Sequence, residues 1–326
     1  MPSVSYAFAV GNVRAKESAL LKKQDIEQLL ALNSRGEAAS FLKDKGYGYA
    51  ETPTEADALL AAEEQKLWEY VASVAPDFSV FSAFIVSNDY HNMKAVFKGM
   101  AVDREYDSLI LRPSLIPVSV IEKSASEQEF SLLPEFCRQA AKEAYEALIK
   151  TGDSQLCDAI LDASCMENKL KMSESVKIGM LCDLIKISVF YDNIKAAIRC
   201  ARSGKSADFC DLCLVDTPVF TKKQLTFSAL KGTENLLELL SSASVYRGAE
   251  AAEAYKASPG QFEKFVDNLL MSVAVKAKYV AVGPEPLIAY LQAKLAEIKA
   301  ARIVVNGIST GEESSKTREM LRELYG

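Results

Sequence analysis

The fold follows from one pattern that occurs in two stretches of the chain about a hundred residues apart. Residues 89–98 read DYHNMKAVFK, and residues 190–199 read FYDNIKAAIR. A fainter third copy, AEIKAARI, stands at residues 296–303. Each copy contains a polar residue, an apolar residue, a lysine and a small residue in that order. This self-similarity predicts a chain built from three helical repeats.

The starts of the outer thirds of the chain also match. Lys22-Lys23-Gln24 recurs as Lys222-Lys223-Gln224, and a leucine-rich stretch follows in both places. Length alone suggests roughly two domains, but the repeat favours three, at residues 1–112, 113–216 and 217–326. The proline-containing stretches 112–117 and 214–218 are then the joints between repeats. The alternative is that amphipathic helices resemble one another without forming a repeat.

Helical periodicity dominates the rest of the chain and predicts an all-α fold. Apolar residues recur at helical spacing over residues 54–74, 79–98 and 286–307, and a short helix is expected over 315–325. Gly99 is expected to end the second of these helices. Alternation with a period of two residues, which would indicate strands, is scarce.

A few short apolar stretches could be strands. Residues 109–111 and 118–121 are brief and lie beside Pro113 and Pro117, which are poor residues for a sheet. We therefore expect both stretches to be connectors.

The bulk composition excludes several classes of protein. Hydrophobic residues make up 49% of the chain and charged residues 25%, which is typical of a globular protein. The net charge of −6 argues against a nucleic-acid partner. The first residues do not have the pattern of a signal peptide, and no window is apolar enough to cross a bilayer. The seven cysteines are an odd number and fit a reducing compartment.

Two short motifs match parts of known phosphate-binding and zinc-binding sites but lack the residues that usually accompany them. Gly204-Lys205-Ser206 matches the end of a phosphate-binding loop, but Arg199 stands where the earlier glycine is needed and the preceding segment is helical in pattern. Gly204 is better interpreted as a helix stop. Cys210 and Cys213 form a CxxC pair without a second pair or histidines to complete a zinc site. Cys200 is the nearest additional thiol.

No set of residues resembles a catalytic site. His91 is the single histidine, so a Ser-His-Asp triad would depend on this one residue, and no Gly-x-Ser-x-Gly motif accompanies it. A structural hydrogen-bonding role is expected for it. We therefore expect no catalytic, cofactor-binding or metal-binding residues.

The stretch from Asn88 to Lys94 resembles a motif of a known family. In the C subunit of V/A-type ATPases, known as the d subunit in eukaryotes, the corresponding segment reads aspartate-tyrosine-histidine-asparagine-leucine-lysine, and Met93 replaces its leucine. The two ends of the chain, around residues 6–17 and 285–302, also resemble that family. The matching positions, all expected to be structural, are Asp89, Tyr90, His91, Asn92 and Lys94.

The resemblance implies an architecture and a role. Three similar helical domains would form a pseudo-threefold funnel that sits on the membrane rotor ring and receives the lower end of the central shaft. The protein would bind no nucleotide and carry no ion. It would be a non-catalytic central-stalk component, peripheral on the cytoplasmic face of the membrane, that couples shaft and ring for ATP-linked proton or sodium transport.

Two other classes of function stay open at this point. One is a stand-alone helical scaffold or interaction protein, although solenoid repeats are usually ~30–45 residues long. The other is an enzyme that uses His91 or the pair Cys210 and Cys213.

Overall fold

The computed structural model describes residues 6–325, and these residues form helices and turns with no strand. The all-α prediction is therefore confirmed. Contacts divide the chain into two compact units, one made of Met1–Phe78 with Glu253–Gly326 and the other of Ser79–Ala252. The division into three repeats at 1–112, 113–216 and 217–326 stays a prediction.

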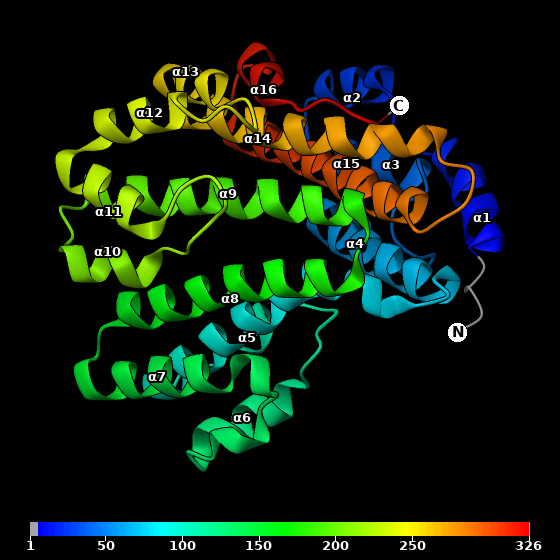
Figure 1. Cartoon of the computed structure of the whole chain (residues 1–326). Coiled ribbons are helices and arrows are strands. Elements are labelled where there is room, and N and C mark those ends of the chain that lie inside the picture. Colours follow the sequence, from blue (N-terminus) through cyan, green and yellow to red (C-terminus); the bar gives the residue numbers. More distant parts are fainter. Residues whose placement is uncertain (1–5, 326) are drawn as a thin grey trace. The chain divides into compact units, whose positions relative to one another are not determined.

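The first unit combines the two ends of the chain (Figure 1). Its helices are α1 (Ala7–Glu17), α2 (Lys23–Leu30), α3 (Arg35–Asp44), α4 (Ala56–Val74), α14 (Pro259–Ala274), α15 (Glu285–Thr310) and α16 (Ser314–Met320). Helix α13 (Gly248–Ala257) spans the boundary between the two units.

The second unit is continuous in sequence. Its helices are α5 (Ser82–Ala101), α6 (Val118–Ser126), α7 (Glu135–Thr151), α8 (Ser154–Val176), α9 (Gly179–Arg202), α10 (Ala207–Cys213), α11 (Lys222–Lys231) and α12 (Thr233–Ser241). Short 3₁₀ turns lie at Phe78–Phe81, Asp107–Leu109 and Phe130–Leu132, with a fourth at Val275–Tyr279 in the first unit.

Helix α15 is the centre of the first unit. It packs against α1, α4 and α14, and most of its apolar residues are buried, including Leu287, Ile288, Leu291 and Val305. Its exposed residues Lys299, Arg302 and Asn306 recur at helical spacing, so the opposite faces of the helix are turned to the core. Helices from both ends of the chain therefore pack around α15.

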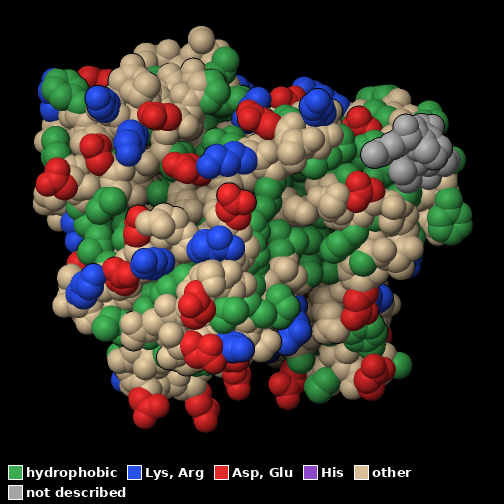
Figure 2. Space-filling view, turned by 60° about the horizontal axis from the view of Figure 1, so that its bottom comes forward, with side chains coloured by type: hydrophobic (Ala, Val, Ile, Leu, Met, Phe, Trp, Pro, Cys, Tyr) green, Lys and Arg blue, Asp and Glu red, His purple; other side chains and the backbone are tan. Residues whose placement is uncertain are grey.

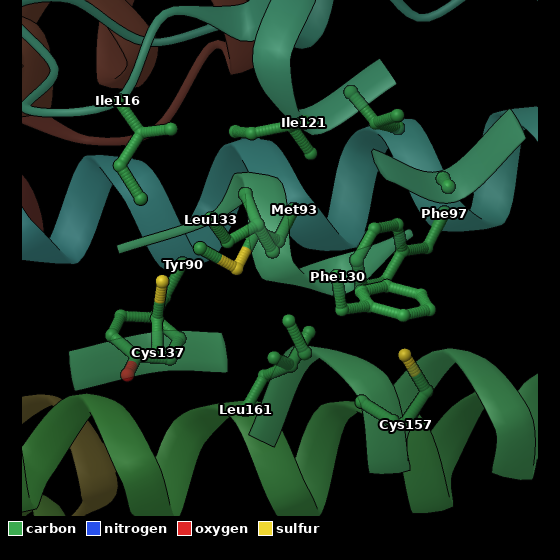
Figure 3. Close-up of a cluster of buried hydrophobic side chains, with 14 of the residues drawn as sticks. Tyr90, Met93, Phe97, Ile116, Ile121, Phe130, Leu133, Cys137, Cys157 and Leu161 are labelled. Atoms are coloured by element: carbon green, nitrogen blue, oxygen red, sulfur yellow. The ribbon is translucent and has the colours of Figure 1, made fainter. Parts of the chain in front are cut away.

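In the second unit, α8 packs against α5, α7 and α9. Figure 3 shows the core between α5, α7 and α8, where Phe97 of α5 lies beside Phe130 and Leu161 of α8 lies below Met93. The rings of Phe97 and Phe130 meet edge to face, with centroids 6.3 Å apart. This core fixes the mutual orientation of α5 and α8, on which the site described below depends.

Local sequence explains where many helices begin. Ser258 caps α14 by accepting the N–H of Gln261 at 3.0 Å, and Pro259 follows at the first helical position. Thr221 and Gln224 form a reciprocal capping box at the start of α11.

Two glycines expected near helix ends lie inside helices. Helix α5 continues past Gly99 to Ala101, and α15 passes Gly307 before it ends at Thr310. A Cβ atom at Gly99 would lie 2.3 Å from the ring of Tyr106, and one at Gly307 would lie 2.5 Å from Oγ1 of Thr317. These glycines permit close packing instead of ending the helices, so the prediction for Gly99 was wrong.

Two other expectations need correction. Residues 118–121 are the first turn of α6 and not a connector, because Pro117 precedes the helix as its N-cap residue. The last helix ends at Met320, and residues 321–325 leave it in extended or irregular conformation.

Candidate functional site

The carboxyl group of Asp89 holds the loop that follows α5. The side chain is fully buried, and Oδ1 accepts the backbone N–H groups of Leu115 and Ile116 at 2.8 and 2.9 Å. Its Oδ2 is buried without a hydrogen-bond partner among residues 6–325. Burial raises the pKa of Asp89 to about 6, although the two backbone hydrogen bonds act in the opposite direction. This carboxyl group therefore binds a proton more readily than an exposed aspartate.

Three neighbouring side chains of α5 hold the same loop. Asn92 donates from Nδ2 to the carbonyl oxygen of Leu111 at 3.0 Å and accepts the N–H of Leu111 at 2.8 Å. Nε2 of His91 lies 2.9 Å from the carbonyl oxygen of Leu109, and Asn88 donates to that of Pro113 at 2.8 Å. The contacts of His91 and Asn92 are thus contacts to backbone, as a structural role requires.

Tyr90 and Lys94 connect α5 to α8. The hydroxyl of Tyr90 lies 2.7 Å from that of Ser164 and accepts the amide N–H of Asn168 at 2.9 Å. Lys94 forms an ion pair of 2.7 Å with Asp162. The five family-motif positions therefore lie together on α5, and each one contacts the loop or the next long helix.

The repeated residues make repeated contacts. Asn193 of α9 donates to the carbonyl oxygen of Val215 at 2.7 Å and accepts the N–H of Val215 at 3.0 Å, as Asn92 does with Leu111. In the faint third copy, Oε2 of Glu297 on α15 accepts the N–H of Leu21 at 2.7 Å. Each of these side chains holds the segment that leads into a new helix, namely α6, α11 or α2.

The third copy includes a buried charge cluster. Nζ of Lys294 lies 2.8 Å from Glu63 and 2.5 Å from Glu297, and the hydroxyl of Tyr47 donates to Glu297 at 2.7 Å. All three charged residues are at least nine-tenths buried. Burial and the neighbouring Glu297 raise the pKa of Tyr47 well above its ordinary value. The cluster joins α15 to α4 and to the loop after α3.

A groove of about 640 Å³ runs beside the motif in the second unit. Its walls are α5, α8, α9 and α10, the first three of which run side by side in Figure 1. Its charged lining residues are Lys94, Asp158, Asp162, Lys169, Asp192, Lys195, Arg199 and Lys205. Five cations and three carboxylates give this groove a net positive charge on a chain of net charge −6.

Several of these charges are already paired. Lys195 lies 2.9 Å from Asp192, and Lys169 lies 3.8 Å from the same carboxylate. Burial tends to raise the pKa of Asp192, but the two lysines outweigh this effect and the pKa is lowered. Arg199 is exposed and forms no ion pair with another described residue. The groove therefore has cationic charge available for a partner.

The Gly204-Lys205-Ser206 motif and the CxxC pair each contribute one residue, Lys205 and Cys213, to the lining of this groove. Gly204 has a φ of +59° and ends α9, as predicted, while Ser206 caps α10 by accepting the N–H of Phe209 at 3.3 Å. Cys213 and Cys200 line the groove and Cys210 is fully buried. Within residues 6–325, no group of three or more His, Cys, Asp and Glu side chains is arranged to hold a metal ion.

The surface and the helices show two further properties. On the face in Figure 2, Lys and Arg side chains are interspersed with Asp and Glu side chains. Throughout the described part of the chain, no helix has both the length and the apolar character that a membrane crossing requires.

Comparison with known proteins decides the family. The family model for the ATP synthase (C/AC39) subunit matches residues 9–320. The chain belongs to this family. Among curated relatives of the C/AC39 chain is the C subunit of the V-type sodium ATPase of Enterococcus hirae, with 22% identity over 323 residues, covering 96% of this chain and 97% of the relative. These findings confirm the resemblance drawn from the sequence.

Sequence reasoning missed two features of this C/AC39 chain. The groove could not be found because its lining comes from helices that are distant in sequence, and no short motif marks it. The buried cluster of Glu63, Lys294 and Glu297 was also missed. The lysine and the glutamate at i and i+3 within an apolar helix were the available signal, since buried charges are usually paired.

Proposed function

We propose that this C/AC39 chain is the non-catalytic central-stalk component that couples the shaft of a rotary ATPase to its membrane rotor ring. The observation that carries the proposal is the match to the family over residues 9–320. In the complex the chain would lie peripherally on the cytoplasmic face of the membrane and serve ATP-linked proton or sodium transport. ATP hydrolysis or synthesis would take place in other subunits.

A coupling protein needs two different surfaces, and the second unit offers candidates for both. The net positive groove between α5, α8 and α9 is our candidate for part of the shaft-binding surface. Exposed apolar side chains around the expected joints and on the neighbouring helices α10 and α11 are our candidates for the ring-facing surface. These are Leu109, Leu115, Leu212, Phe227 and Leu230, whose exposed fractions range from 36% to 60%.

Stiffness is the third requirement, because a part that transmits torque must deform little. Helix α8 packs against both α5 and α9, and a close-packed core joins it to α5; such interiors have low compressibility. The loop after α5 is held by Asp89, Asn92 and His91, so a ring-facing surface on this loop would be firmly attached to the helices.

The proposal is tested by separating the two surfaces. The double variant Leu109→Ser/Leu115→Ser should lose binding to the purified proteolipid ring and keep binding to the shaft subunits. In the assembled complex, ATP hydrolysis should then no longer drive ion transport. A matched control is Ile149→Ser, which changes an equally exposed side chain on α7. Normal ring binding and fully coupled hydrolysis in the double variant would contradict this assignment.

A further inference from the structure

Three thiols gather where the chain reverses between α9 and α10. Cys200 lies in the last turn of α9, and Cys210 and Cys213 lie on α10 after the turn at Gly204. The N–H of Lys205 donates to the carbonyl oxygen of Cys200 at 3.1 Å, which fixes the turn. Cys200 and Cys213 both line the groove, whereas Cys210 is fully buried.

The three thiols differ in their readiness to ionise. A hydrogen bond from the Cys200 thiol lowers the pKa of Cys213, Arg199 adds to this effect, and burial opposes it. The same interaction raises the pKa of Cys200, and burial raises that of Cys210 to about 12. Cys213 is also partly exposed. Thiolate character and access to solvent therefore coincide at Cys213 alone among the three.

We propose that Cys213 and Cys200 are a peroxide-sensitive thiol pair, with Cys213 as the nucleophile and Cys200 as the resolving thiol. The inference rests on two cysteines that line one groove, on adjacent helices joined by a short turn, with the cationic Arg199 lining the same groove. It does not depend on the proposed coupling function.

The chemistry requires only hydrogen peroxide or another hydroperoxide as oxidant. The Cys213 thiolate attacks one peroxide oxygen, the O–O bond breaks, hydroxide leaves, and Cys213 becomes a sulfenic acid. The Cys200 sulfur then attacks the Cys213 sulfur. The S–S bond forms, the S–O bond breaks, and the departing hydroxyl takes the Cys200 proton as water. The two sulfurs are oxidised to a disulfide, and the peroxide is reduced.

The CxxC pair is the competing assignment. Cys210 does not line the groove, and its raised pKa keeps it a thiol. Two other cysteines of the second unit are poor competitors as well. Burial raises the pKa of Cys157 to about 11 and that of Cys137 to about 12.

Peptide mapping by mass spectrometry of the peroxide-treated full-length protein tests the pair directly. The expected product is a Cys200–Cys213 disulfide with the loss of two hydrogens. Cys213→Ser should abolish it. Cys200→Ala should also abolish it but leave a sulfenic acid on Cys213 that dimedone traps. Cys210→Ala is the matched control and should still form the disulfide.

A second measurement remains informative if a variant fails to fold. In the unmodified protein, iodoacetamide should label Cys213 first, with a pH midpoint below the ~8.5 of an ordinary cysteine thiol. A Cys210–Cys213 disulfide, a cross-link that survives in Cys200→Ala, or labelling of Cys213 no faster than that of the other cysteines would overturn the proposal.

Discussion

The buried carboxyl group of Asp89 links the stability of the second unit to pH. Its pKa of about 6 in the folded chain is above the ordinary value of 3.8, so the folded state binds this proton more tightly than the unfolded chain. The stabilisation is complete below about pH 4 and is lost as the pH rises through 6. Deprotonation leaves a charged Oδ2 without a partner in the described part of the chain.

Asp89→Asn should remove this dependence, because the amide keeps the Oδ1 acceptor and does not ionise. Between pH 4 and 7 the unmodified protein should lose roughly 1–3 kcal/mol of unfolding free energy relative to the variant. Urea unfolding followed by circular dichroism at several pH values measures the difference. Parallel pH profiles for the two proteins would show that Asp89 does not titrate in this range.

Lys294 is the central cation of the buried cluster in the first unit. Lys294→Met would leave Glu63 and Glu297 buried without it, and removing one partner of a buried ion pair costs about 3–5 kcal/mol. The midpoint of urea unfolding should fall accordingly. Lys299→Met is the matched control on the same helix, since its pair with Asp267 is half exposed and should cost little. Equal losses in the two variants would be inconsistent with this account.

The loop after α5 is an element whose position depends on a few side-chain contacts. Asn92→Ala would leave the N–H and the carbonyl oxygen of Leu111 without their partner, and because these groups are only partly buried, the loss should be about 1 kcal/mol in all. Hydrogen exchange at Leu111 should become faster. Asn193→Ala should have the same effect at Val215, whereas Asn12→Ala, a change to a partly exposed residue on α1, should affect neither site. Unchanged exchange at Leu111 in Asn92→Ala would refute the anchoring role.

Helices could be predicted from the sequence where their pattern is local. The bounds of α4, α5 and α15 expected from apolar residues at helical spacing agree with the structure to within a few residues. The errors arose where tertiary packing decides the outcome. Gly99 looks like a helix end, but the ring of Tyr106 packs against it, and Pro117 looks like a breaker although it caps α6. The interactions of these residues cannot be inferred from their neighbours in sequence.

At the scale of the whole molecule, the three similar segments around Asn92, Asn193 and Glu297 are more alike in their contacts than in their sequence. The third copy has Glu297 where the others have asparagine, yet it still holds a backbone N–H ahead of a new helix. The partner, Leu21, lies at the opposite end of the chain. Helix α15 thus holds a segment near the N-terminus, whereas α5 and α9 each hold the loop that follows them in sequence. The sequence around the third copy could not predict this contact.

The assignment of the groove to the shaft makes a prediction about charge. Arg199→Glu removes a cation from the groove wall and introduces a like charge for any acidic partner surface, so affinity for the shaft subunits should fall about tenfold or more. The loss should shrink at high salt, because exposed charges are screened. Binding of the purified shaft subunits at two ionic strengths measures both effects.

Arg202→Glu provides the control for this prediction. Arg202 is exposed on the same helix, three residues further along, and does not line the groove. Both variants change the net charge of the chain equally, so a general electrostatic effect would weaken binding in both. A loss confined to Arg199→Glu would locate the shaft in the groove. Equal binding by all three proteins would mean that the shaft docks elsewhere, while leaving the family membership and the ring-facing loop unaffected.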